Sequence, residues 1–199
     1  MSRNHSNNAS LTVVGTGIKF KSHLTVEAEA YIKESDIVLY LVCFVLYGHP
    51  TIFAKPALDA VLQARNEGFY AKILPGISAE DCLFADLLIN PGASGCQSYE
   101  ATDFLIYQRK IDTSCHVILW QVGIIGALGY SKEHDNTCGS NVLSHALAKY
   151  YERDHQIILY EAAQYPHLEP RINISTLNEL PHADCTQLTT LCSPPIRRI

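Results

Sequence analysis

Apolar and polar residues alternate along the first half of the chain in a way that predicts strands followed by helices. A short β-branched run at 11–14 leads into Gly15-Thr-Gly17, which is typical of a buried strand that ends in a tight turn. Apolar positions at helical spacing then continue to about Ser35, and Thr25 is a favourable cap for that helix. Pro56 and Gly68 bracket a second helix, at its first turn and just past its end.

The second helix is expected to bury a stripe that consists of Leu58, Val61 and Leu62. A strand at 69–74 follows it, and Ser78 then begins another helix, with Asp81 placed to complete part of a capping box. Strands and helices that alternate in this order imply a parallel sheet covered on both faces. We therefore expect an α/β fold.

The loop at 90–95, Asn-Pro-Gly-Ala-Ser-Gly, is the strongest break in this pattern and the expected domain boundary. It leaves a polar leader at 1–10, an N-terminal parallel α/β domain at 11–91 and a C-terminal mixed α/β domain at 92–199. In the second domain the pattern predicts a helix near 100–107 and another that follows Gly139-Ser140 and runs to about Tyr151, and strands at 116–122, 157–161 and 187–192. The two α/β lobes are expected to have a cleft between them.

One apolar run, from Ile37 to Tyr47, is too long for this scheme. It has eleven residues and no turn residue, whereas an ordinary strand has ~5–6. Adjacent parallel strands need a crossover of about a dozen residues or more. Either one unusually long strand forms here, or a connecting segment is missing between Val42 and Cys43.

Composition and charge exclude several classes of function. With 15 Lys and Arg against 20 Asp and Glu, and no basic cluster beyond Arg197-Arg198, nucleic acid is not an expected partner. The start of the chain lacks a signal-peptide pattern, and no apolar run is long enough for a membrane span. The seven cysteines are scattered without a CxxC pair, so we expect reduced thiols in a cytoplasmic protein. His134 and Cys138 lack further ligands, and no metal is expected.

Glycine and proline turns follow several of the predicted strands. Gly15-Thr-Gly17 is half of a dinucleotide-binding fingerprint, but Phe20 stands at the third glycine position, which favours an ordinary strand-end turn. Tyr47-Gly-His-Pro50, Leu74-Pro-Gly-Ile-Ser78 and Trp120-Gln-Val-Gly123 occupy the places where open α/β sheets bind ligands. Each alone is an ordinary turn; three together, each with a polar side chain, favour a ligand site.

The order of Val14-Gly-Thr-Gly17, Tyr47-Gly-His-Pro-Thr-Ile-Phe53 and Ser78-Ala-Glu-Asp-Cys-Leu-Phe-Ala-Asp86 resembles the tetrapyrrole methylase superfamily of S-adenosylmethionine (SAM) methyltransferases. Within it the chain is most similar to the borosin peptide-backbone N-methyltransferases, because His49 stands where precorrin methylases have an aspartate. Further stretches match as well: Gly95-Cys-Gln-Ser-Tyr-Glu-Ala101, Leu119-Trp-Gln-Val-Gly123 and Tyr160-Glu-Ala-Ala163. The resemblance runs from about Leu11 to Pro195.

The resemblance implies a two-lobed tetrapyrrole-methylase-like fold, with a parallel-sheet N-terminal domain, here truncated, and a mixed-sheet C-terminal domain. SAM would lie between the lobes, and a homodimer is expected on the same basis. The resemblance assigns to the cofactor Tyr47, His49, Ile52 and Phe53 as lining, Ser78 and Gln121 as polar contacts, and Tyr160, Ala162, Ala163, Thr189 and Thr190 around the adenosine.

Relatives carry several dozen residues between the strand that includes Val42 and the strand that ends at Tyr47, and this segment is absent here. In borosin enzymes it supplies an Arg and a Tyr that face the methyl-accepting amide, so Tyr47 is the catalytic residue that the resemblance retains. A backbone amide nitrogen is a poor nucleophile because its lone pair is delocalised into the carbonyl. A phenolate beside the positively charged sulfonium would accept the amide proton. The alternative is that Tyr47 is a strand-end aromatic residue that packs on the cofactor.

We therefore expect a SAM-dependent enzyme that methylates backbone amide nitrogens of a peptide, with activity impaired by the missing segment. In many fungal relatives the substrate is the enzyme's own C-terminal extension; because this chain ends at Ile199, a separate peptide acting in trans is expected. Two alternatives stay open. One is a small-molecule methylase of the precorrin or uroporphyrinogen type, against which His49 and the Ser78–Asp86 run argue. The other is a non-catalytic SAM-binding remnant, which the missing segment motivates.

Overall fold

The computed structural model describes residues 10–19, 22–35, 48–127 and 136–196 of the 199. The chain divides into two compact units, Met1–Cys82 with Ala162–Glu169, and Leu83–Glu161 with Pro170–Ile199. It passes from the first to the second inside α3 (Ala79–Asp86). The 90–95 loop, where the sequence predicts the domain boundary, lies in the second unit and contains the short helix α4 (Pro91–Ser94). This stretch is helical because the Asn90 side chain accepts the Gly92 N–H as a cap.

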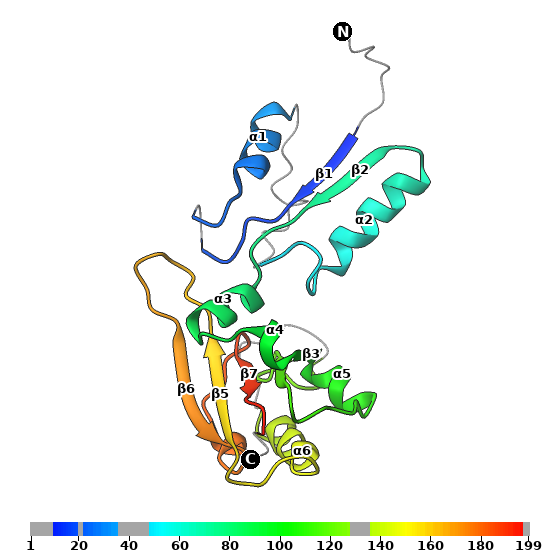
Figure 1. The fold of residues 1–199 in the computed structure, drawn as a ribbon. Coiled ribbons are helices and arrows are strands. Elements are labelled where there is room, and N and C mark those ends of the chain that lie inside the picture. The colour runs from blue at the N-terminus through cyan, green and yellow to red at the C-terminus, as the bar shows by residue number, and fades with distance from the viewer. Residues whose placement is uncertain (1–9, 20–21, 36–47, 128–135, 197–199) are drawn as a thin grey trace, which may run out of the picture. The chain divides into compact units, whose positions relative to one another are not determined.

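The described part of the first unit contains two parallel strands, β1 (Ser10–Val14) and β2 (Tyr70–Leu74), in which Val14 lies opposite Leu74. α1 (Val26–Glu34) begins where the sequence predicts, because the Thr25 hydroxyl accepts the Ala28 N–H at 3.1 Å. Val14, Ala28 and Leu74 form one small core, and a second core joins both strands to α2 (Lys55–Asn66). Figure 1 shows α1 and α2 beside the two strands.

α2 presents a different stripe to the strands from the predicted one. Val61 is buried as expected, but Leu58 is 40% and Leu62 is 48% exposed. The buried partners are Ala54, just before the helix, and Ala57. The prediction of Leu58 and Leu62 as core residues is wrong because the small alanines allow the helix to lie close to the sheet, which leaves the leucines on its outer side.

The second unit contains a five-stranded mixed sheet in the order β3-β4-β7-β5-β6, which confirms the mixed sheet expected for the C-terminal half. Its strands are β3 (Cys96–Glu100), β4 (His116–Trp120), β5 (Gln156–Glu161), β6 (Arg171–Thr176) and β7 (Thr190–Ser193). β3 and β4 are parallel, and the other neighbours are antiparallel. The ends of β4 and β5 and the start of β7 therefore meet at one edge of the sheet.

Three helices pack against the apolar core of this sheet: α5 (Ala101–Ile106), α6 (Thr137–Leu147) and the 3-10 helix η1 (Leu180–His182). Val117 and Leu119 of β4 meet Leu143 and Leu147 of α6 in this core, and all four are fully buried. Among the described residues no helix has the length and apolar character that a membrane span requires.

Several predicted boundaries differ from the structure for local reasons. The strand predicted to reach residue 122 ends at Trp120, because Gln121 adopts a φ of +58°. The strand predicted from residue 187 begins at Thr190, because the Thr189 N–H bonds to the Thr186 carbonyl in a tight turn. β3 and β6 were not predicted, although Ile172 and Ile174 alternate as in a strand. The Ile37–Tyr47 run, with Val42 and Cys43, lies outside the described residues.

Candidate functional site

The glycine and proline turns of the first unit lie against one another where its two strands end. A Cβ on Gly15 would lie 2.7 Å from Pro50 Cδ and 3.1 Å from Gly76 Cα. Gly17 and Gly48 form an isolated bridge, and Gly48 has a φ of +107°, which favours glycine. The turns of the first unit that the sequence singles out are thus adjacent in space.

His23 supports the first of these turns. Its Nδ1 accepts the backbone N–H groups of Ile18 and Lys19, both at 3.2 Å. A Cβ on Gly17 would lie 2.1 Å from the His23 Cβ, so only glycine fits there. Burial, and then the nearby Lys19 charge, hold the pKa of His23 below its ordinary value.

His49 bonds within its own turn through one ring nitrogen. Its Nδ1 accepts the Thr51 N–H at 3.2 Å and lies 3.0 Å from the Thr51 hydroxyl. In the neutral ring the proton therefore sits on Nε2, which can donate to a ligand. Ile52 and Phe53 follow directly and are 36% and 52% exposed, and Phe53 has a φ of +54°. A hydrogen-bond donor and apolar side chains are the kinds of group that line small-molecule sites.

Ser78 is buried and caps α3, as the sequence predicts. Its N–H and hydroxyl both donate to Asp81 Oδ2, at 2.7 and 2.6 Å, while the hydroxyl accepts the Asp81 N–H at 3.1 Å. The capping box is therefore complete. Because its single hydroxyl proton goes to Asp81, Ser78 has only acceptor capacity left for a ligand.

The second unit brings its candidate residues together at one edge of its sheet. Thr190 pairs with Tyr160 across β7 and β5, and the Val122 N–H donates to the Thr189 carbonyl at 3.1 Å. Tyr160, Thr189 and Thr190 are each buried. Gln121 stands at the end of β4 in the left-handed conformation, which costs a non-glycine residue free energy and is common at functional sites.

Two carboxylates that sequence reasoning left without a role contact these residues. The Tyr160 hydroxyl donates to Asp86 Oδ2 at 2.7 Å, and the Thr189 hydroxyl donates to Glu161 Oε1 at 2.5 Å. Both carboxylates occur inside stretches that carry the family resemblance, at the end of Ser78–Asp86 and within Tyr160–Ala163. Their hydrogen-bond partners lie far away in the sequence, so the sequence alone gives no signal for these contacts.

The remaining expected residues are placed as follows. Ala162 and Ala163 follow β5 and belong to the first unit, where Ala163 is buried. Tyr47, the expected catalytic residue, lies outside the described residues, as does His134. The part of the chain that the structure describes holds no group of three or more metal-ligating side chains.

Comparison with known proteins identifies relatives of this chain. The chain is 43% identical over 155 residues to a Gymnopus fusipes protein named as a methyltransferase and precursor of ribosomally synthesized cyclic gymnopeptides, covering 76% of this chain and 37% of that protein. It is 34% identical over 222 residues to a Coprinopsis marcescibilis protein named as a methyltransferase and type I borosin cyclic peptide precursor, covering 85% and 57%. The chain is a homologue of the borosin methyltransferases. No family model matches it.

The chain is shorter than the relatives that it matches. The chain spans from about a third to just over half of the length of these two relatives. The Coprinopsis match runs over 222 residues, more than the 199 of the chain, so the relative has residues in that region without a counterpart here.

Solved structures establish the fold of the borosin homologue. A uroporphyrin-III C-methyltransferase from Thermus thermophilus, complexed with S-adenosylhomocysteine, matches with a TM-score of 0.62 at 15% identity, over 94% of this chain and 92% of that chain. This confirms the expected tetrapyrrole methylase fold. An identity this low supports a conclusion about the fold and not about the activity.

Proposed function

We propose that this protein is a SAM-dependent methyltransferase that acts on backbone amide nitrogens of a peptide. The observation that carries the proposal is the identity of 34–43% to proteins named both as methyltransferases and as precursors of cyclic peptides. The relatives' names join an enzyme to a ribosomally made peptide, which favours a peptide over a tetrapyrrole as the substrate.

The arrangement of residues at the strand ends supports this proposal. In the first unit, glycines allow the turns to pack on one another, since a Cβ on Gly15 would lie 2.7 Å from Pro50 and one on Gly76 would lie 3.1 Å from Gly15. The turn that contains His49 is thereby held, and the Nε2 of His49 is placed to donate. Bound SAM supplies a methyl group already activated on a sulfonium. We assign to it His49, Ile52, Phe53, Ser78, Ala162 and Ala163 of the first unit, and Gln121, Tyr160, Thr189 and Thr190 of the second.

Tyr47 is our proposal for the residue that moves the proton. The amide nitrogen must lose its N–H proton for its lone pair to attack, and a tyrosine phenolate is a suitable acceptor. Nearby positive charge lowers the pKa of a phenol, because it stabilises the phenolate. Replacement of Tyr47 by Phe should therefore abolish methylation and leave cofactor binding intact.

We further propose that the segment between Val42 and Cys43 is shortened relative to the borosin enzymes. The Coprinopsis match, which is longer than the chain, supports this. Because the absent segment carries an Arg and a Tyr in those enzymes, turnover is expected to be slow. The same observation favours a second candidate function, a protein that binds SAM without transferring its methyl group.

One experiment separates these functions. Purified protein is incubated with SAM and a hydrophobic peptide, or with uroporphyrinogen, and each substrate is analysed by mass spectrometry, while binding of S-adenosylhomocysteine (SAH) is measured by calorimetry. Mass gains of one methyl on backbone nitrogens of the peptide support the proposed enzyme. SAH binding without any methylation supports the non-catalytic binder, and methylation of uroporphyrinogen alone contradicts the peptide substrate.

We also propose that the protein is a homodimer, on the family resemblance. Light scattering during size-exclusion chromatography tests this, because a single chain has a mass of 22.1 kDa. A monomer at micromolar concentration contradicts the proposal without affecting the enzymatic one.

A further inference from the structure

A single carboxylate oxygen joins three elements at the edge of the second unit's sheet. Glu161 Oε1 accepts hydrogen bonds from the hydroxyls of Thr189 at 2.5 Å and Thr186 at 2.9 Å, and from Arg171 Nη1 at 3.1 Å. The Glu161 side chain is 16% exposed. Three donors on one oxygen of this largely buried side chain fix the position of the carboxylate.

The two threonine hydroxyls pass this constraint on to the turn that leads into β7. The Thr189 hydroxyl accepts the Thr186 N–H at 2.7 Å, and the Thr186 hydroxyl accepts the Leu188 N–H at 3.1 Å. The Thr189 N–H also donates to the Thr186 carbonyl at 3.1 Å. Since each hydroxyl accepts from a backbone amide and donates to Glu161, the 186–189 turn is held through the carboxylate.

The 186–189 turn also holds the loop that follows β4. The Thr189 carbonyl accepts the Val122 N–H, and the Thr186 carbonyl lies so close to Gly123 that a Cβ there would be 1.9 Å away. Between β4 and this contact stands Gln121, with its φ of +58°. A strained backbone conformation persists only where the neighbouring structure enforces it. The carbonyls of Thr186 and Thr189 contact the residues that directly follow Gln121, so they help to hold its conformation.

We propose that Glu161 is a positioning residue for the cofactor: through the 186–189 turn it fixes Gln121, Thr189 and Thr190, three of the four residues of the second unit that we assign to SAM. The inference rests on the proposed function, in which these residues contact SAM. Glu161 itself need not touch the cofactor. Arg171 completes the arrangement from the outer side, where its Nη2 also bonds to the carbonyl and carboxylate of Asp184, at 2.8 and 2.9 Å.

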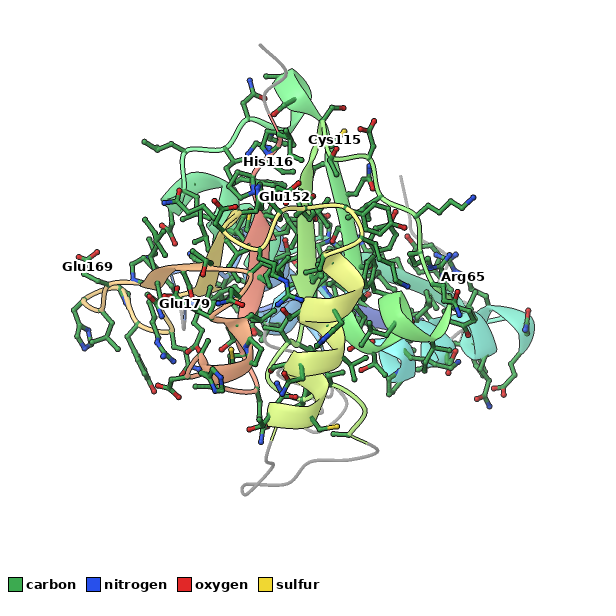
Figure 2. All side chains as sticks on the ribbon, turned by 90° about the horizontal axis from the view of Figure 1, so that it is seen from below. Arg65, Cys115, His116, Glu152, Glu169 and Glu179 are labelled. Atoms are coloured by element: carbon green, nitrogen blue, oxygen red, sulfur yellow. The ribbon has the colours of Figure 1, made fainter. Side chains whose placement is uncertain are left out.

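The test compares three variants by SAH calorimetry and thermal unfolding. Glu161→Ala removes the acceptor and should weaken SAH binding about tenfold, as expected when displacement of the turn costs about one hydrogen bond between protein and cofactor. Glu161→Gln keeps an acceptor oxygen and should restore most of the affinity. The matched control is Glu179→Ala: the Glu179 carboxylate (Figure 2) also takes two hydrogen bonds, from Ser175 and the Thr176 N–H, but at a turn away from these residues, so affinity should be unchanged.

Unchanged SAH affinity in folded Glu161→Ala would overturn the proposal, and so would an equal loss in Glu179→Ala. If Glu161→Ala does not fold, Thr186→Val takes its place, because Thr186 donates to Glu161 and is not assigned to the cofactor. Thr186→Ser is the conservative rescue, and the same outcomes decide. Where the protein is an enzyme, the KM for SAM should rise in Glu161→Ala more than kcat falls.

A second measurement separates this inference from the proposed function. If the unaltered protein binds no SAH, the proposed function fails, and hydrogen exchange of the Val122 amide then decides the positioning claim. Exchange at Val122 that is faster in Glu161→Ala than in Glu179→Ala supports the claim. Equal exchange in the two variants contradicts it.

Discussion

The hydroxyl of Tyr160 donates a hydrogen bond of 2.7 Å to the carboxylate of Asp86. Tyr160 is 1% exposed near the end of β5, whereas Asp86 is the last residue of α3 and is exposed. The bond joins residues 74 positions apart and fixes the ring of Tyr160 beside Thr190. Because the hydroxyl proton goes to Asp86, the Tyr160 hydroxyl has no proton left to donate to a ligand.

This bond predicts how Tyr160→Phe will behave. Loss of a charge-assisted hydrogen bond should cost about 1.5–3 kcal/mol of unfolding free energy. For a chain of this size that corresponds to a fall in Tm of about 3–10 °C, measurable by calorimetry. The affinity for SAH should stay within about twofold of the unaltered protein, because the ring is kept. Loss of SAH binding in a folded Tyr160→Phe protein would mean that the hydroxyl contacts the cofactor.

Local signals in the sequence predict much of this fold, and non-local contacts explain the rest. The caps at Thr25 and Ser78 are read correctly, because a cap depends on residues within one helical turn. The exposure of Leu58 and Leu62 is not predicted correctly, because it depends on how closely the helix approaches the sheet. The cofactor residues that we propose come from the resemblance. The role of Glu161 could not, because its threonine partners are 25 and 28 residues away.

Three helix ends share one hydrogen-bond pattern but differ in the residue at its left-handed position. α2 ends with Gly68 at φ +87°, α3 with Leu88 at +54° and α5 with Gln108 at +47°. In each, the next residue's N–H bonds back five positions: Phe69 to Ala64, Ile89 to Phe84, and Arg109 to Phe104. This is the pattern in which glycine is favoured.

Replacement of Leu88 by Gly should therefore stabilise the protein. The left-handed conformation costs a leucine about 1–2 kcal/mol, and the greater freedom of glycine in the unfolded chain offsets part of that gain. Leu88 is 92% exposed, so little packing is lost. A rise in Tm is expected, with Gly68→Ala as the opposite control, which should lower it. A fall in Tm for Leu88→Gly would show that the leucine makes contacts that outweigh its strain.

His23 predicts a dependence of stability on pH. Its pKa lies below the ordinary 6.5 in the folded protein, mainly because of burial, so the unfolded chain binds more protons below that pH. Stability should be fully present above pH 6.5 and should be lost as the pH falls from there through the lowered pKa. Protonation of Nδ1 would also break the bonds from Ile18 and Lys19. Urea unfolding from pH 7.5 to 5 measures the effect.

The control for this prediction is His23→Gln, which cannot gain a proton. Its unfolding free energy should change less between pH 7.5 and 5 than that of the unaltered protein. Burial lowers the pKa of His116 and His155 as well, so some dependence on pH should remain. Figure 2 places His116 beside Cys115 in the second unit. Equal slopes in the two proteins would exclude His23 as a contributor.

Gly123 gives the strictest steric prediction. A Cβ at this position would lie 1.9 Å from the Thr186 carbonyl oxygen and 2.5 Å from its carbon, and a backbone group cannot move aside as a flexible side chain can. Gly123→Ala should therefore displace the 186–189 turn or the Gln121 loop and cost about 3 kcal/mol or more, seen as a lower urea midpoint. Gly92→Ala is the matched control, because its Cβ would meet only the Asn90 side chain at 3.3 Å. Equal urea midpoints for the two variants would mean that the turn and the loop are not in contact in solution.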